Sequence, residues 1–196
     1  MASETSVVTP GRFASGLDSY PAWLDAILER KAEFQKHYDE YVPQAADIAA
    51  VKALVKQHGV KVLVIGEHWC PDVWRGLPVI AKIAEATGME MRILFRDQNK
   101  DVMAEFLNQG QFESIPVFVF YDRNHRCLGP WIERPKLATE QMAAVRKRVM
   151  PNGAPAEGPE RDALMLQYRE ETNQLAGEWR HATLTEIREL LEQKLK

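Results

Sequence analysis

Cys70 is the residue best placed for chemistry, because it lies where a strand is expected to end and a helix to begin. The apolar run 62–65 precedes it and ends at Gly66, and apolar residues at helical spacing follow it. Pro71 suits a first helical turn, since its missing N–H would have no partner there. A sulfur at this position faces unpaired backbone N–H groups and the positive end of the helix dipole. Both favour the thiolate, so the sequence predicts a reactive cysteine.

Three ionisable neighbours could change the pKa of Cys70. Glu67 and Asp72 are negative and would raise this pKa, whereas a protonated His68 would stabilise the thiolate. The His68 imidazole could instead act as a base, or be a half-exposed loop residue. No Asn or Asp is placed by sequence to orient it, so no catalytic Cys-His pair is predicted.

The composition is that of an ordinary soluble chain, with 45% hydrophobic and 27% charged residues among 196. The net charge of −3 and the lack of a basic stripe give no reason to expect nucleic acid as a partner. No apolar run reaches the roughly 18 residues of a membrane span, and residues 1–16 read as a loosely attached segment, not a secretory signal. Two cysteines are typical of a reducing compartment such as the cytoplasm. Together with five histidines they form no zinc-binding spacing, so no metal site is expected.

The apolar periodicity predicts alternating strands and helices around Cys70. Parallel crossovers come first and a hairpin comes last, which favours helix layers packed over one sheet. The expected elements are helices over 20–41 and 44–58, strand 60–65, helix 72–87, strand 90–95, a helix to about 109, strands 115–121 and 126–132, and helix 137–150.

Both ends of the chain are expected to be helical. The apolar face of 20–41 is typical of core packing or an oligomer seam, although a cofactor-binding or partner-binding helix would show the same stripe. Residues 151–159 are rich in Pro and Gly and predict a linker. The amphipathic segment 161–196 is expected to break near 182, because Thr183 and Glu186 form a capping-box pattern. These terminal helices either wrap onto the domain or form a homodimer.

Four motifs in order resemble the thioredoxin family. Trp69-Cys70-Pro71 corresponds to the start of the family's Trp-Cys-Gly-Pro motif, and Pro78 to its helix-kinking proline. The turn 97–99 and the segment 114–116, which would carry a cis-proline, have counterparts in the family. The resemblance covers roughly 60–150 and is closest to bacterial members with a Trp-Cys-Pro-Asp-Cys motif.

The resemblance implies an α/β fold, a thioredoxin-like three-layer α/β/α sandwich with a mixed sheet and helical extensions at both ends. The domain boundaries are then 1–59 for the N-terminal helical extension, 60–150 for the thioredoxin-like domain, and 151–196 for the linker and C-terminal helical extension. No clear counterpart of the family's first strand is present.

The resemblance also assigns residues to the site. Cys70 is the nucleophile, and Trp69, Pro71, Ile115 and Pro116 line the groove that binds an extended thiol-bearing chain.

Two parts of the family's dithiol chemistry are missing. Val73 stands at the position of the second cysteine, so the motif is Trp-Cys-Pro-Asp-Val. Val64 stands at the position of the family's buried acid, six residues before the cysteine. A mixed disulfide formed by Cys70 therefore needs an external thiol for its release.

Cys127 is not expected to supply that thiol. A two-residue hairpin turn at 123–124 would pair it with about Phe120, four residues from Pro116 and roughly 13 Å away along the strand. A disulfide needs Cα atoms within about 7 Å. We therefore expect Cys127 to be a packing cysteine on the sheet.

Three functional hypotheses follow. The first is a cytoplasmic monothiol oxidoreductase or thiol-capture protein in cell redox homeostasis, in which Cys70 reacts with a thiol- or disulfide-bearing protein or a small thiol. It would have no bound cofactor, with glutathione or another low-molecular-weight thiol as the external resolving thiol. The second is a redox-inactive binding or dimerisation module. The third is a glutathione-handling protein, against which the short C-terminal segment counts.

Overall fold

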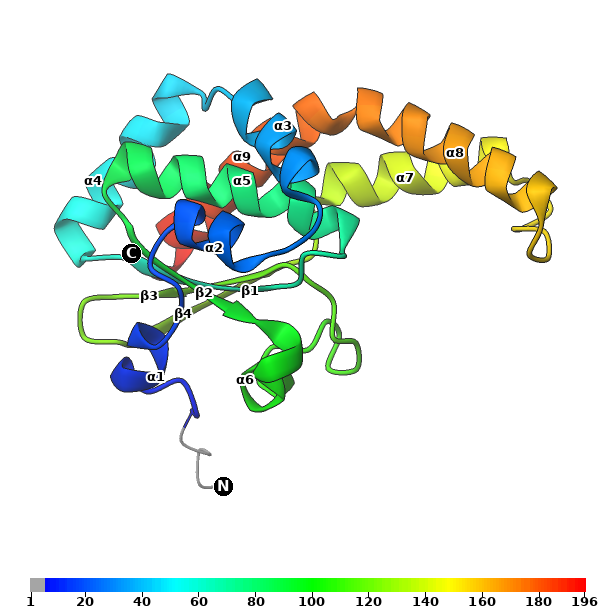
Figure 1. Cartoon of the computed structure of the whole chain (residues 1–196). Helices are drawn as coiled ribbons and strands as arrows, with labels where there is room; N and C mark the ends of the chain where they lie inside the picture. The colour runs from blue at the N-terminus through cyan, green and yellow to red at the C-terminus, as the bar shows by residue number, and fades with distance from the viewer. Residues whose placement is uncertain (1–5) are drawn as a thin grey trace.

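The structure is a computed structural model that describes residues 6–196. Its centre is one mixed sheet with the strand order β2-β1-β3-β4 (Figure 1). Strand β1 is parallel to β2 and antiparallel to β3, and β3 and β4 form an antiparallel hairpin. The strands are β1 (Lys61–Gly66), β2 (Glu90–Phe95), β3 (Val117–Tyr121) and β4 (Cys127–Ile132).

Helices cover both faces of this sheet, which confirms the predicted three-layer α/β arrangement. The long helix α5 (Pro71–Thr87) lies on one face and packs against α4 (Ala45–His58) and α9 (Ala176–Lys194), which also contact each other, while α1 (Pro10–Ala14) and α6 (Lys100–Ala104) lie on the other face (Figure 1). Because both faces are covered, the inner strands β1 and β3 are apolar along nearly their whole length. The remaining helices are α2 (Tyr20–Ala26), α3 (Lys31–Glu40), α7 (Lys136–Val149) and α8 (Pro159–Gln174), with a 3₁₀ turn at Arg96–Gln98.

Both ends of the chain share one core with the central part. Val8 and Phe13 from the N-terminal segment, and Leu184 and Ile187 from α9, belong to the same buried cluster as the sheet. Backbone hydrogen bonds of 2.9 Å in both directions join residue 17 to residue 93 at the β2 edge. The prediction of a loosely attached segment is therefore wrong for residues 6–16, and residues 1–5 lie outside the part of the chain that the structure describes.

The predicted helix 20–41 is two helices. The chain turns between α2 and α3, where Ile27 is extended and Arg30 has a φ of 67°. Neither Gly nor Pro marks this corner. It allows Trp23 and Phe34 to pack against each other in the core, with ring centroids 5.7 Å apart, while Leu28 remains exposed. Core packing of the apolar stripe is confirmed.

The prediction that the C-terminal helix breaks near residue 182 is also wrong. The chain bends at Leu175, between α8 and α9, and Thr183 lies buried inside α9. Its hydroxyl donates to the Trp179 carbonyl at 2.9 Å, so it caps no helix. Glu186 instead accepts hydrogen bonds from the Trp131 indole and the Lys136 backbone N–H, both at 2.8 Å. This carboxylate therefore binds the first turn of α7 from a neighbouring helix.

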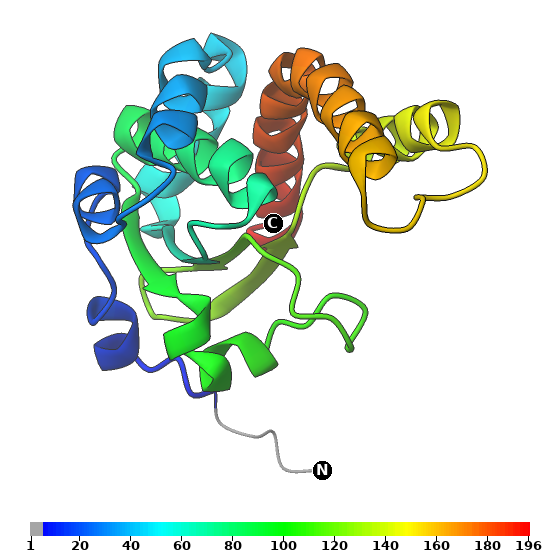
Figure 2. The same cartoon turned by 45° about the vertical axis from the view of Figure 1, so that its right-hand side comes forward.

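Helices α7 and α8 project from the body as an arm, which we define as residues 136–174 (Figures 1 and 2). The arm leaves the body on the side where α5 begins. A small apolar cluster of Val145, Val149 and Met150 joins its two helices. None of the helices within residues 6–196 has the length and hydropathy needed to cross a membrane.

Candidate functional site

Cys70 lies at the joint between β1 and α5. It is the N-cap residue of α5, is half-buried, and is followed by Pro71 in the first helical turn. Its thiol donates to the Ile115 carbonyl oxygen at 3.6 Å, and the Ile115–Pro116 peptide bond is cis. The structure thus brings Cys70, Pro71, Ile115 and Pro116 together.

The pKa of the Cys70 thiol is raised, contrary to the expectation from helix position alone. Burial is the largest cause, because removing the sulfur from water disfavours the thiolate. The backbone N–H groups of Val73 and Asp72 at the helix start lower the pKa of the thiol, as does the charge of Arg134, while the Asp72 carboxylate raises it. Desolvation prevails, so the pKa of Cys70 lies above that of an ordinary cysteine.

Asp72 forms a half-buried ion-pair cluster with two arginines. Its carboxylate lies 2.8 Å from the Arg134 guanidinium and 3.5 Å from that of Arg75. Burial raises the pKa of Asp72, and the two arginines oppose this shift. Arg134 follows β4, 64 residues after Cys70 in the chain, so no local sequence pattern indicates its place at the site.

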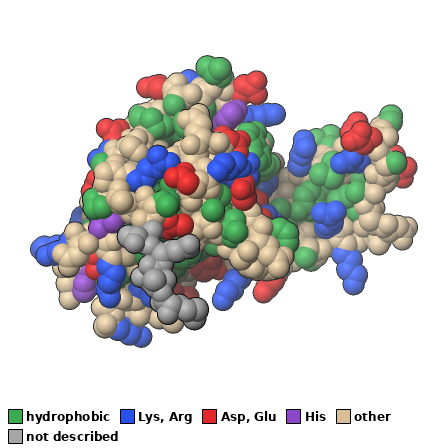
Figure 3. Space-filling model, turned by 90° about the horizontal axis from the view of Figure 1, so that it is seen from below, with side chains coloured by type: hydrophobic (Ala, Val, Ile, Leu, Met, Phe, Trp, Pro, Cys, Tyr) green, Lys and Arg blue, Asp and Glu red, His purple; other side chains and the backbone are tan. Residues whose placement is uncertain are grey.

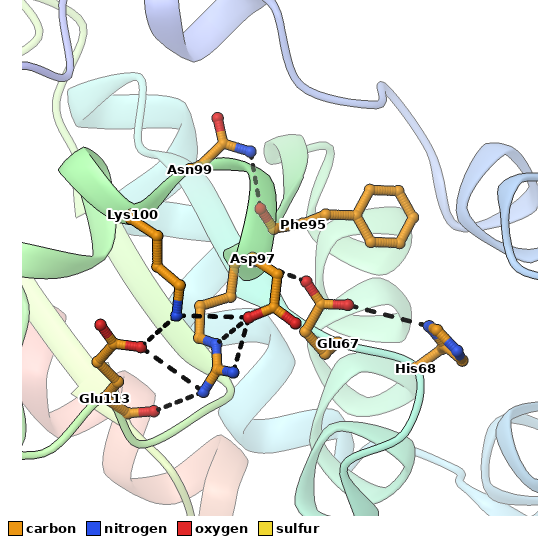
Figure 4. Close-up of polar contacts among 8 residues, drawn as sticks. Glu67, His68, Phe95, Asp97, Asn99, Lys100 and Glu113 are labelled. Carbon is orange, nitrogen blue, oxygen red and sulfur yellow. Dashed lines mark hydrogen bonds and ion pairs between the residues drawn. The ribbon is translucent and has the colours of Figure 1, made fainter.

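The Glu67 side chain binds the turn after β2 and lies beside His68. The Glu67 carboxylate accepts the Asp97 backbone N–H at 2.8 Å, and its other oxygen is 3.9 Å from the His68 imidazole (Figure 4). Burial raises the pKa of Glu67. Asp72 and Arg134 are the charged groups that shift the pKa of Cys70, and Glu67 instead ties the Cys70 loop to the turn after β2.

Trp69 lies beside Cys70 with 48% of its surface exposed. The Arg96 guanidinium lies over its ring, 5.0 Å from the centroid. Arg96 also pairs with Asp97 at 2.7 Å and lies 3.8 Å from the Glu113 carboxylate, and Lys100 contacts both acids (Figure 4). This charged network joins Trp69 to the segment that leads into the cis-proline.

The sequence matches the family model described as thioredoxin over residues 19–147. The chain belongs to the thioredoxin family. The match includes α2 to α4 and most of α7, whereas α8 and α9 follow it. A comparison with curated proteins gave no match.

Two solved structures share the fold. One is a protein of unknown function from Pseudomonas aeruginosa, with 18% identity and a TM-score of 0.61. The other is an HIV epitope-scaffold, with 16% identity and a TM-score of 0.63. Each alignment covers 92% of this chain and 95% of the other. At these identities the likeness extends to the fold alone.

Within this thioredoxin fold, valines occupy the two positions that differ from the family motif. Val64 and Val73 are fully buried. Val73 packs closely on Gly66, because a Cβ atom added at Gly66 would lie only 2.9 Å from the Val73 side chain. Cys70 and Cys127 are both free. No group of three or more metal-ligating side chains occurs within residues 6–196.

The prediction for Cys127 was wrong in two respects. It is exposed and so is not a packing cysteine. It pairs with Tyr121 instead of Phe120, because the loop closes with an Asp122–Arg126 backbone bond and the register shifts beside Tyr121. Tyr121 is five residues beyond Pro116 along the strand, roughly 16 Å away, well beyond the Cα separation of a disulfide.

Proposed function

We propose that Cys70 performs monothiol disulfide exchange or thiol capture. The observation that supports this most directly is a single thiol at the start of α5, 3.6 Å from the carbonyl beside a cis-proline. Buried Val73 occupies the position from which a second thiol would attack. A protein with this arrangement can form a mixed disulfide and has no internal thiol to release it.

In the proposed step the Cys70 thiolate attacks one sulfur of a partner's disulfide. A new S–S bond forms, the old one breaks, and the second sulfur leaves as a thiolate that takes a proton from solvent. An external thiol, such as glutathione or another low-molecular-weight thiol, later attacks the mixed disulfide and restores Cys70. A reducing compartment such as the cytoplasm would supply that thiol.

The raised pKa of Cys70 should slow both steps of this reaction. Attack is slow at neutral pH because little thiolate is present. Release is slow as well, because a thiol of high pKa is a poor leaving group. The expected behaviour is slow capture followed by a persistent mixed disulfide, and this differs from a rapidly cycling reductase.

The test uses the full chain with Cys127→Ser, so that Cys70 is its one thiol. We expect the rate of alkylation to keep rising above about pH 8.5, the pKa of an ordinary cysteine. Incubation with a disulfide should give one mixed disulfide per chain by intact mass, and none after Cys70→Ser.

The raised pKa of Cys70 also favours a second candidate, a redox-inactive thioredoxin-like binding module. In that case the thiol remains unmodified by disulfides even at alkaline pH, while the fold and the neighbouring surface bind a partner without covalent bonding. Failure to form any mixed disulfide would decide for this candidate.

A further inference from the structure

The arm stands beside the thiol end of the molecule. In Figures 1 and 2 the arm and the loop before β3 both project from the side where α5 begins. The space-filling view shows the arm set apart from the body, with apolar, basic and acidic side chains on it (Figure 3). Its hydrogen bond to α5, from Arg75 to the Asn173 side chain at 2.9 Å, lies one helical turn after Cys70. The arm is thus fixed next to the candidate site.

One face of the arm continues the surface around Cys70. The Met142 sulfur lies 3.5 Å from the Arg134 guanidinium. Met142 and Arg146 are four residues apart in α7 and therefore share one face of that helix. Burial raises the pKa of Tyr168, and the charges of Arg134, Arg75 and Arg146 lower it. Arg134 also lowers the pKa of Cys70, so its charge acts on both the thiol and the arm. We call Arg134, Met142, Arg146 and Tyr168 the inner face of the arm.

The charges of this face are incompletely neutralised. Arg134 is paired with Asp72 and Glu133. Arg146 is exposed, and within residues 6–196 it forms no ion pair. It lies ten residues into α7, which places it about 15 Å along the helix from the base of the arm.

Two aromatic side chains are exposed in the segments that carry the site. Trp69 precedes Cys70 and is 48% exposed, and Phe112, in the loop before the cis-proline, is 56% exposed. Aromatic residues, Met and Arg are the types enriched in protein interfaces. The residue types exposed on these segments and on the arm are therefore suited to binding a polypeptide.

We propose that the inner face of the arm docks the acidic segment that flanks the cysteine of a captured protein. This inference rests on the proposed function and names its partner class, a protein disulfide next to Asp or Glu residues. The charge of Arg146 selects that segment, while Met142 and Tyr168 supply apolar contact. The arm thereby distinguishes proteins from small disulfides.

The experiment compares three probes on the full chain with Cys127→Ser at about 0.01 M salt, where charges act over roughly 30 Å. Two peptides carry one cysteine activated as a 2-pyridyl disulfide, flanked by three Glu or by three Lys residues. The third probe is uncharged 2,2′-dipyridyl disulfide. Rates of mixed-disulfide formation are measured for the parent, for Arg146→Glu, and for Lys56→Glu, which makes the same charge change on exposed α4.

We expect the Glu peptide to react about fivefold faster than the Lys peptide, the effect of one well-formed surface ion pair. Arg146→Glu should abolish or invert that ratio, Lys56→Glu should preserve it, and the uncharged probe should react equally with all three proteins. Equal peptide rates in the parent, or an unchanged ratio in Arg146→Glu, would overturn the docking proposal while the proposed function stands. If Cys70 forms no mixed disulfide with the uncharged probe, that result would refute the proposed function itself.

Discussion

Glu186→Ala should destabilise the protein markedly, because one carboxylate binds two different elements. Its bond to the indole of the buried Trp131 is a hydrogen bond to a charged group, for which about 1.5 kcal/mol is a low value. Its bond to the Lys136 N–H satisfies the first turn of α7, and loss of such a cap costs about 1 kcal/mol. The sum is a loss of about 2.5 kcal/mol, or a Tm lower by roughly 5–10 °C for a chain of this size.

The assay is urea unfolding followed by far-UV circular dichroism. Glu186→Gln keeps an acceptor oxygen and should cost about 1 kcal/mol. Glu189→Ala is the matched control on the same helix, since Glu189 is exposed and lies 3.8 Å from Arg188 in a surface pair. It should change the free energy of unfolding by less than about 0.5 kcal/mol.

A double-mutant cycle then isolates the indole bond. Trp131→Phe removes the N–H, so Glu186→Ala should cost about 1.5 kcal/mol less in the Trp131→Phe background. Equal losses for Glu186→Ala and Glu189→Ala, or no coupling in the cycle, would refute this account of how α9 holds the base of the arm.

Three further predictions concern single residues. Asp72→Asn should lower the pKa of Cys70, because the Asp72 charge raises it, and alkylation at pH 7 should become several-fold faster; an unchanged or slower rate would contradict this. Burial and, secondarily, Arg180 lower the pKa of His37 to about 4. Since the unfolded chain takes up this proton near pH 6.5, stability should be full above that pH and fall by at most about 3 kcal/mol on going to pH 4; His37→Gln should flatten this decline in acid unfolding curves. Val73→Cys should shorten the lifetime of the mixed disulfide at Cys70, because Val73 stands in the first turn of the helix that Cys70 caps, at the position of the family's second cysteine; a lifetime equal to that of the parent by intact mass would show the added thiol to be ineffective.

Local patterns in the sequence predicted the sheet and the place of Cys70. Strands β1 and β2 and helix α5 agree with their predicted ranges to within about a residue, because apolar runs ended by Gly and a Pro in the first helical turn are local signals. The corner between α2 and α3 has no such signal. Pairing of Trp23 with Phe34 in the core sets it, and a helical stripe looks the same with or without a bend.

The properties of the site likewise comprise some that the sequence predicts and some that depend on tertiary packing. A cysteine before a proline at a helix start, and valine where the family has a second cysteine, can be read from the chain. The raised pKa of the Cys70 thiol depends on how deeply the packed protein buries the sulfur, which residue order does not contain. Likewise, Arg134 and Tyr168 reach the site only because β4 and the arm fold back beside α5.

The sequence by itself determined that this protein is a thioredoxin-fold chain with one thiol at the family's reactive position, because those features depend on residue types at fixed local spacing. The tertiary structure alone decided that the pKa of this thiol is raised, that Asp72 is held by arginines, and that an arm stands beside it. Burial and electrostatic interactions depend on distances between segments far apart in the chain, and only folding establishes those distances.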